Sequence, residues 1–141
     1  MDRIDQHAAG HDEKPILIID DDEELRRSMV DLLQSLGFAA EAVADGELAF
    51  ERLQRAPAPW LILLDLSMPV MDGCAFRAEQ RRCTALRAIP VVLVTADANV
   101  EERARALGVD GYLRKPVGAR ELEPLVRSFE RREARTAQTL V

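Results

Sequence analysis

The segment Ile-Leu-Ile-Ile-Asp-Asp-Asp at residues 16–22 joins a short apolar run directly to three carboxylates. Apolar runs without polar alternation are typical of strands that are covered on both faces, as in a parallel sheet. Similar runs lie at 60–64 and 89–94, with further apolar runs at 38–43 and, more weakly, at 111–113. The chain therefore has five candidate strands, which begin at residues 16, 38, 60, 89 and 111.

Amphipathic helical patterns fill the intervals between these runs. One stripe follows the 3.6-residue period over Leu25, Met29, Leu32, Leu33 and Leu36. Acidic residues precede this stripe and a glycine follows it, as expected at the two ends of a helix. Further helical patterns lie at 100–107 and 122–129, and weaker ones at 46–55 and 73–83. Five alternating strand–helix units require right-handed crossovers and predict a doubly wound α/β fold, with a five-stranded parallel sheet and five helices.

Length and charge limit the classes of function. The 141 residues suit one domain, expected at 15–131, with a flexible arm at 1–14 and a tail or helix extension at 132–141. A net charge of −6 disfavours binding to nucleic acid or to anionic membranes. The apolar runs are too short to span a bilayer, and residues 1–14 lack the apolar core of a secretory signal. We therefore expect a cytoplasmic protein.

The cysteines and histidines do not predict a structural site. Cys74 and Cys83 fall on opposite faces of the expected helix, about 13 Å apart along its axis, which is too far for a disulfide. We expect two reduced thiols. His7 and His11 lie in the polar N-terminal arm, and no thiol or carboxylate pattern around them completes a metal site.

Chemically reactive side chains follow the expected strands at their carboxyl ends. Asp20 and Asp21 follow the first strand, Asp65 the third, Thr95 ends the fourth and Lys115 follows the fifth. Ligands of open α/β sheets bind at this edge, where the carboxyl ends of parallel strands meet. We therefore expect these five side chains to surround one pocket.

Three carboxylates in one pocket repel each other unless a cation lies between them. Mg²⁺ fits best, because it needs few protein ligands and keeps water and phosphate oxygens in its coordination shell. Lys115 and Thr95 add an ammonium group and a hydroxyl donor, which suit a phosphoryl group. Asp65 is then the expected nucleophile, and its product is an acyl phosphate.

Each feature also has an ordinary structural explanation. An acidic run before a helix often only stabilises the helix N-terminus, and a single Asp after a strand is often a cap. A Thr at a strand end and a Lys-Pro pair in a loop are common as well. Suitable residues occur at four strand ends, in order along the chain, and this coincidence favours the functional interpretation.

The same segments resemble the receiver domain of two-component response regulators. The resemblance is carried by Ile-Leu-Ile-Ile-Asp-Asp-Asp (16–22), Leu-Leu-Asp-Leu-Ser-Met-Pro-Val-Met-Asp-Gly (63–73), Val-Thr-Ala (94–96) and Gly-Tyr-Leu-Arg-Lys-Pro (111–116). It covers about residues 14–131. It implies a flavodoxin-like receiver fold with the strand order 2-1-3-4-5.

The resemblance also implies a role for each site residue. Asp65 would accept the phosphoryl group, and Lys115 would pair with it. Asp21 would ligate Mg²⁺ directly, Asp20 mostly through water, and Ser67 through its main-chain carbonyl. These assignments rest on the family pattern at the matching positions.

The resemblance implies a switch as well. Thr95 would turn towards the phosphoryl oxygen, and Tyr112 would be the aromatic residue whose burial follows it. The peptide bond between Lys115 and Pro116 would be cis, a rare conformer. None of these features follows from composition or periodicity.

The resemblance suggests partners but does not name them. A histidine kinase or a phosphotransfer protein would donate the phosphoryl group, and the receiver would catalyse only its own phosphorylation and dephosphorylation. The surface of helix 97–107, the strand at Tyr112 and the helix after Gly118 would then change and control an unknown protein, or form a homodimer. About a dozen residues follow Phe129, too few for a helix-turn-helix, so we expect no direct contact with nucleic acid.

Two other functions use similar residues. A phosphatase of the haloacid dehalogenase type also has an Asp nucleophile and Mg²⁺, but it needs an acid two residues after the nucleophile, where this chain has Ser67. A receiver-like module that never accepts phosphate would lack Asp65, Thr95 or Lys115, and all three are present.

Overall fold

The computed structural model describes residues 14–66 and 72–140, and side-chain detail within it ends at residue 135. Its five strands are β1 (Ile16–Ile19), β2 (Ala40–Val43), β3 (Leu61–Leu64), β4 (Val91–Thr95) and β5 (Gly111–Arg114). All neighbouring strands are parallel, in the order β2-β1-β3-β4-β5. The expected doubly wound sheet and its strand order are confirmed.

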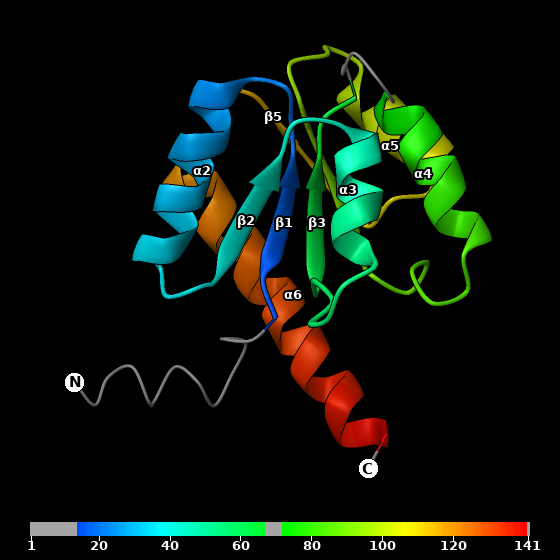
Figure 1. Ribbon diagram of the computed structural model, residues 1–141. Helices are drawn as coiled ribbons and strands as arrows, with labels where there is room; N and C mark the ends of the chain where they lie inside the picture. Colours follow the sequence, from blue (N-terminus) through cyan, green and yellow to red (C-terminus); the bar gives the residue numbers. More distant parts are fainter. Residues whose placement is uncertain (1–13, 67–71, 141) are drawn as a thin grey trace.

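Five helices cover the sheet on its two faces (Figure 1). They are α2 (Glu23–Ser35), α3 (Gly46–Leu53), α4 (Gly73–Arg82), α5 (Val100–Leu107) and α6 (Ala119–Leu140). Alternate residues of the strands point to opposite faces. One face packs against α3, α4 and α5, and the other against α2 and α6. No helix in the described part of the chain is both long and apolar enough to cross a membrane.

Aspartate side chains start three of the helices. Asp22, Asp45 and Asp72 each accept a hydrogen bond from the backbone N–H three residues further on, at 3.2, 2.9 and 2.8 Å. This satisfies an N–H group that has no partner inside the helix. At the other end of α2, Gly37 has a φ of 98°, a conformation that glycine adopts without strain. The expected start and end of this first helix are confirmed.

Some boundaries differ from the sequence prediction. The apolar run at 38–43 yields a strand only from Ala40, because Phe38 packs in the core instead, with its ring centroid 6.0 Å from that of Trp60. Helix α3 ends at Leu53 rather than at residue 55. Helix α6 continues through residues 132–140, beyond the sheet (Figure 1). The expected arm at 1–14 lies almost wholly outside the described residues.

A buried polar network joins α4 to α5. Arg77 donates hydrogen bonds to the main-chain carbonyls of Leu107 and Gly108, at 3.1 and 2.6 Å, where α5 ends. It also donates to the side chain of Gln80, at 2.7 Å. Gln80 in turn donates to two carbonyls of the loop between α4 and β4. Both side chains are buried, so these hydrogen bonds replace the hydrogen bonds to water that are lost on folding.

Truncation of a core residue tests the packing of α2 on the sheet. Leu33 is fully buried, so Leu33→Ala removes its contacts and leaves a cavity. We expect the free energy of unfolding to fall by about 2–5 kcal/mol in urea denaturation. The control is Leu48→Ala, because Leu48 is 42% exposed and its replacement should change that free energy by about 0.5 kcal/mol or less. Equal effects of the two substitutions would contradict the described packing.

Candidate phosphoryl and metal site

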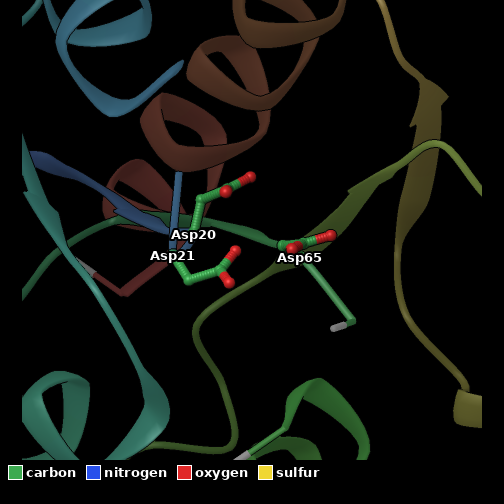
Figure 2. A group of neighbouring side chains, drawn as sticks. All are labelled: Asp20, Asp21 and Asp65. Carbon is green, nitrogen blue, oxygen red and sulfur yellow. The ribbon is translucent and has the colours of Figure 1, made fainter. Parts of the chain in front are cut away.

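The pairing of β1 with β3 brings Asp20 and Asp65 together. Ile19 of β1 lies beside Leu64 of β3, and the N–H of Asp65 donates to the carbonyl of Ile19 at 2.9 Å. Asp20 and Asp65 therefore leave adjacent strands at the same level, and Asp21 follows directly. Figure 2 shows the three side chains gathered at this edge of the sheet.

A second register brings the threonine and the lysine to the same edge. Thr95 at the end of β4 lies beside Arg114 of β5, and the N–H of Lys115 donates to the carbonyl of Thr95 at 3.0 Å. The peptide bond between Lys115 and Pro116 is cis, as expected. The Lys115 ammonium lies 2.9 Å from Asp20 Oδ2 and 3.6 Å from Asp65 Oδ1.

The three carboxylates form a cluster that fits a small divalent cation. Each offers one oxygen, and these oxygens lie within 4.8 Å of one another. Asp20 and Asp65 are 2% and 5% exposed, whereas Asp21 is open to solvent. Buried carboxylates need a compensating cation, and hard oxygen ligands are those that Mg²⁺ prefers. Lys115 supplies one positive charge for three negative ones.

The pKa of the Asp65 carboxyl is raised by burial and by the negative charges around it. Burial raises the pKa most, and repulsion from Asp20 and, less strongly, from Asp21 raises it further. Lys115 and the N–H of Leu66 act in the opposite direction without cancelling the rise. Burial also acts to lower the pKa of Lys115, but its hydrogen bond to Asp20 and its attraction to both carboxylates outweigh burial and raise it.

Thr95 lies at the fourth strand end and is 5% exposed. Its hydroxyl oxygen accepts a hydrogen bond of 3.3 Å from the N–H of Asp97. The Asp97 carboxylate accepts from the N–H of Asn99 at 2.8 Å and lies 3.3 Å from the guanidinium of Arg103. A short chain of contacts therefore connects Thr95 to the first turns of α5.

The start of α4 presses against the backbone that carries Asp65. The N–H of Gly73 donates to the carbonyl of Leu66 at 2.9 Å. A Cβ atom at position 73 would overlap the carbonyl oxygen of Asp65 and lie 2.8 Å from the Cα of Leu66. This close approach of two backbones requires glycine at that position.

A cleft of about 930 Å³ opens beside these residues. Four of its lining residues are site residues expected from the sequence, Asp21, Asp65, Thr95 and Lys115, and a fifth, Leu66, follows Asp65. The others are Asp72, Cys74, Ala96, Asp97 and Arg103. The structure thus brings four strand ends to one pocket, as the sequence predicts, although Asp20, also expected there, is buried and is not one of its lining residues.

One predicted residue, Tyr112, is not part of this arrangement. Tyr112 lies on β5, is 41% exposed, and borders a separate hollow of about 280 Å³ with residues of α5, including Ala104 and Arg105. Ser67 lies outside the described residues. Its proposed carbonyl ligand therefore stays a prediction.

The sequence did not single out two residues of the cleft wall. Cys74 lies in the first turn of α4, and both cysteines are free, as expected. Arg103 comes from α5 and reaches the cleft from the side, with one guanidinium nitrogen 3.7 Å from the Sγ of Cys74. In the sequence, the only indication for either residue is that it lies within two turns of the N-terminus of a helix, and that this end of the helix borders the pocket.

The raised pKa of Asp65 predicts a pH-dependent effect on stability. The folded protein holds the Asp65 proton more tightly than the unfolded chain, so stability decreases as the pH rises from 3.8 through the raised pKa. Asp65→Asn removes this penalty. Without divalent cations, we expect the variant to have a higher free energy of unfolding than the wild type at pH 7, and no advantage below about pH 3.8.

The control for this measurement is Asp31→Asn, which changes an exposed carboxylate of α2 outside the site. Its free energy of unfolding should follow that of the wild type across the same pH range. A less stable Asp65→Asn variant at pH 7 would mean that attraction to Lys115 outweighs burial and repulsion.

Sequence comparisons identify the family. The response regulator receiver domain matches residues 16–127. The sensory transduction protein RegX3 of Mycobacterium tuberculosis is 38% identical over 119 residues, which are 83% of this chain and 51% of that protein. The probable transcriptional regulator ycf27 of Porphyridium aerugineum is 37% identical over 83% of this chain and 48% of its own length. The chain thus spans about half the length of these curated relatives.

Solved structures agree with this family. The chemotaxis response regulator CheY4 of Vibrio cholerae superposes with a TM-score of 0.74 at 28% identity, over 83% of this chain and 98% of that one. A response regulator receiver protein from Pseudomonas putida gives a TM-score of 0.75 at 28% identity, over 82% and 97% of the two chains. The fold, the acidic pocket and the sequence match lead to one conclusion: this chain belongs to the receiver domain family of two-component response regulators.

Proposed function

We propose that this receiver accepts a phosphoryl group on Asp65 from a histidine kinase or a phosphotransfer protein. The observation that carries the proposal is the position of the Asp65 carboxylate, which faces a cleft between two further aspartates and Lys115. Receiver domains as a family accept phosphoryl groups from histidine kinases. The donor of this particular chain is part of the proposal.

The residues of the pocket have distinct roles in this reaction. Asp20, Asp21 and Asp65 would hold Mg²⁺, together with the main-chain carbonyl of Ser67. The ion supplies charge neutralisation for the phosphoryl oxygens. A carboxylate oxygen of Asp65 attacks the phosphorus, and the bond from phosphorus to the leaving group breaks as the new bond forms. Lys115, already 3.6 Å from Asp65, neutralises a phosphoryl oxygen in the product.

The phosphorylated state would change the surface near α5 and β5. The hydroxyl of Thr95 would exchange its contact with the N–H of Asp97 for a phosphoryl oxygen. Tyr112, now 41% exposed beside a hollow at α5, would move inward as Thr95 turns. The face of α5, β5 and the start of α6 would then bind a protein target or a second copy of the chain.

The competing phosphatase function has less support. It needs a second acid two residues after the nucleophile, where this chain has Ser67. The family match favours a receiver, which transfers phosphate to itself rather than turning over a substrate.

Magnesium binding can be measured through stability. A cation that binds the folded state raises the free energy of unfolding, by about 1.4 kcal/mol at a concentration ten times its dissociation constant. We expect the melting temperature of the wild type to rise with Mg²⁺, and Asp21→Asn to remove most of the rise. Asp31→Asn, on exposed α2 surface, should retain it. An unchanged response in Asp21→Asn would place the ion elsewhere.

Phosphorylation can be measured by intact mass. With Mg²⁺ and a small phosphodonor, we expect a wild-type adduct of one phosphoryl group, mapped to Asp65, and no adduct in Asp65→Asn. Lys115→Met should slow formation by about a hundredfold, because it removes a cation that stabilises the transferred group. An adduct that persists in Asp65→Asn, or sustained hydrolysis of many donor molecules per protein, would overturn the proposal.

A further inference from the structure

Arg103 is a second cation in the wall of the cleft. It lies in the first turns of α5, where its own N–H donates to the carbonyl of Asn99 at 2.9 Å. One guanidinium nitrogen lies 3.3 Å from the Asp97 carboxylate, and another lies 3.7 Å from the Sγ of Cys74. These two contacts come from different elements. They hold the guanidinium between α4 and α5, at the side of the pocket.

The two cations among the described lining residues differ in their surroundings. Lys115 is 21% exposed and already contacts two buried carboxylates, Asp20 and Asp65. The Arg103 side chain is 45% exposed and has one carboxylate partner, Asp97, which is itself 30% exposed. A guanidinium has five N–H donors in a planar fork, so this single partner leaves donors available. Arg103 is therefore the cation that an incoming anion meets near the mouth of the cleft.

Phosphodonors differ in the charge of their leaving groups. In phosphoryl transfer the attacking and leaving oxygens lie roughly in line, so the leaving group departs on the side away from Asp65. An acyl phosphate such as acetyl phosphate releases a carboxylate, which gains negative charge as its bond to phosphorus breaks. Phosphoramidate is protonated on nitrogen before the bond from phosphorus to nitrogen breaks, so it releases uncharged ammonia. A cation at the cleft mouth therefore assists the first class of donor far more than the second.

We propose that Arg103 binds the carboxylate leaving group of small acyl phosphates and so makes this receiver responsive to them. The proposal rests on the proposed phosphorylation of Asp65. In the step, an oxygen of Asp65 forms a bond to phosphorus while the bond from phosphorus to the acyl oxygen breaks. The electron pair of that bond stays on the departing carboxylate, and no proton is needed. The Arg103 guanidinium stabilises that carboxylate by charge-assisted hydrogen bonds.

The alternative is a purely structural role. Arg103 contacts Asp97, which contacts Thr95 through its backbone, so loss of the side chain could loosen the loop that carries Thr95. A loosened loop would slow phosphorylation by every donor to the same extent. The ratio of the rates with two donors separates the alternatives, because only a leaving-group contact changes that ratio.

The experiment measures the rate of Asp65 phosphorylation by intact mass, with Mg²⁺ and either acetyl phosphate or phosphoramidate. For Arg103→Gln we expect a rate about tenfold lower with acetyl phosphate and nearly unchanged with phosphoramidate, as for the loss of one charge-assisted contact. Arg103→Lys keeps the charge and should recover part of the acetyl phosphate rate. The matched control is Arg82→Gln, on the neighbouring helix α4 but 72% exposed and outside the cleft, which should resemble the wild type.

Equal slowing with both donors, or no slowing with either, would overturn the role of Arg103 and leave the phosphorylation of Asp65 intact. A wild-type protein that forms no adduct with either donor would overturn both proposals. A change in the donor ratio in Arg82→Gln as large as that in Arg103→Gln would also refute the assignment, because it would reflect the overall charge of the protein.

Discussion

Repulsion between carboxylates held by the sheet is the constraint on which this site depends. The hydrogen bond from the Asp65 N–H to the Ile19 carbonyl fixes the level at which β1 and β3 end, and so keeps the backbones of Asp20 and Asp65 side by side. The pocket excludes much of the water that would screen their charges. The register of β4 and β5 brings Lys115 to the same point, and its single charge leaves the pocket short of cations. The hydrogen bonds between the strands thus maintain an arrangement of charges that the side chains alone would not adopt.

The sequence predicted the fold because both of its main signals are local. Apolar runs mark the buried strands, and the residue after each run is forced to the carboxyl edge of a parallel sheet. Asp20, Asp65, Thr95 and Lys115 could therefore be grouped without knowledge of any contact between them. The strand order, by contrast, came from family resemblance, since periodicity does not say which strands are neighbours.

Features that depend on side-chain packing were less accessible. Phe38 belongs to the apolar run, but its ring packs beside Trp60 and it lies before the strand. The apolar run is therefore longer than the strand. Arg103 reaches the cleft from the flank of a helix, and its role depends on where α5 sits relative to α4. Such a residue does not follow a strand, so the rule that locates the other site residues in the sequence does not apply to it. Tyr112 was identified by resemblance, and it lies at a separate hollow rather than in the cleft.

The network around Arg77 has a mechanical consequence for α5. Arg77 holds the carbonyls at the far end of α5, and Gln80 secures Arg77 from within α4. The near end of α5 follows the loop of Asp97 and packs in the core through Val100, an apolar contact rather than a set of hydrogen bonds. A rotation of α5 that preserved the Arg77 bonds would be centred near Gly108, and its displacement would be larger towards the cleft. Such a rotation would therefore change the wall of the cleft at Arg103 more than the end of the helix that Arg77 holds.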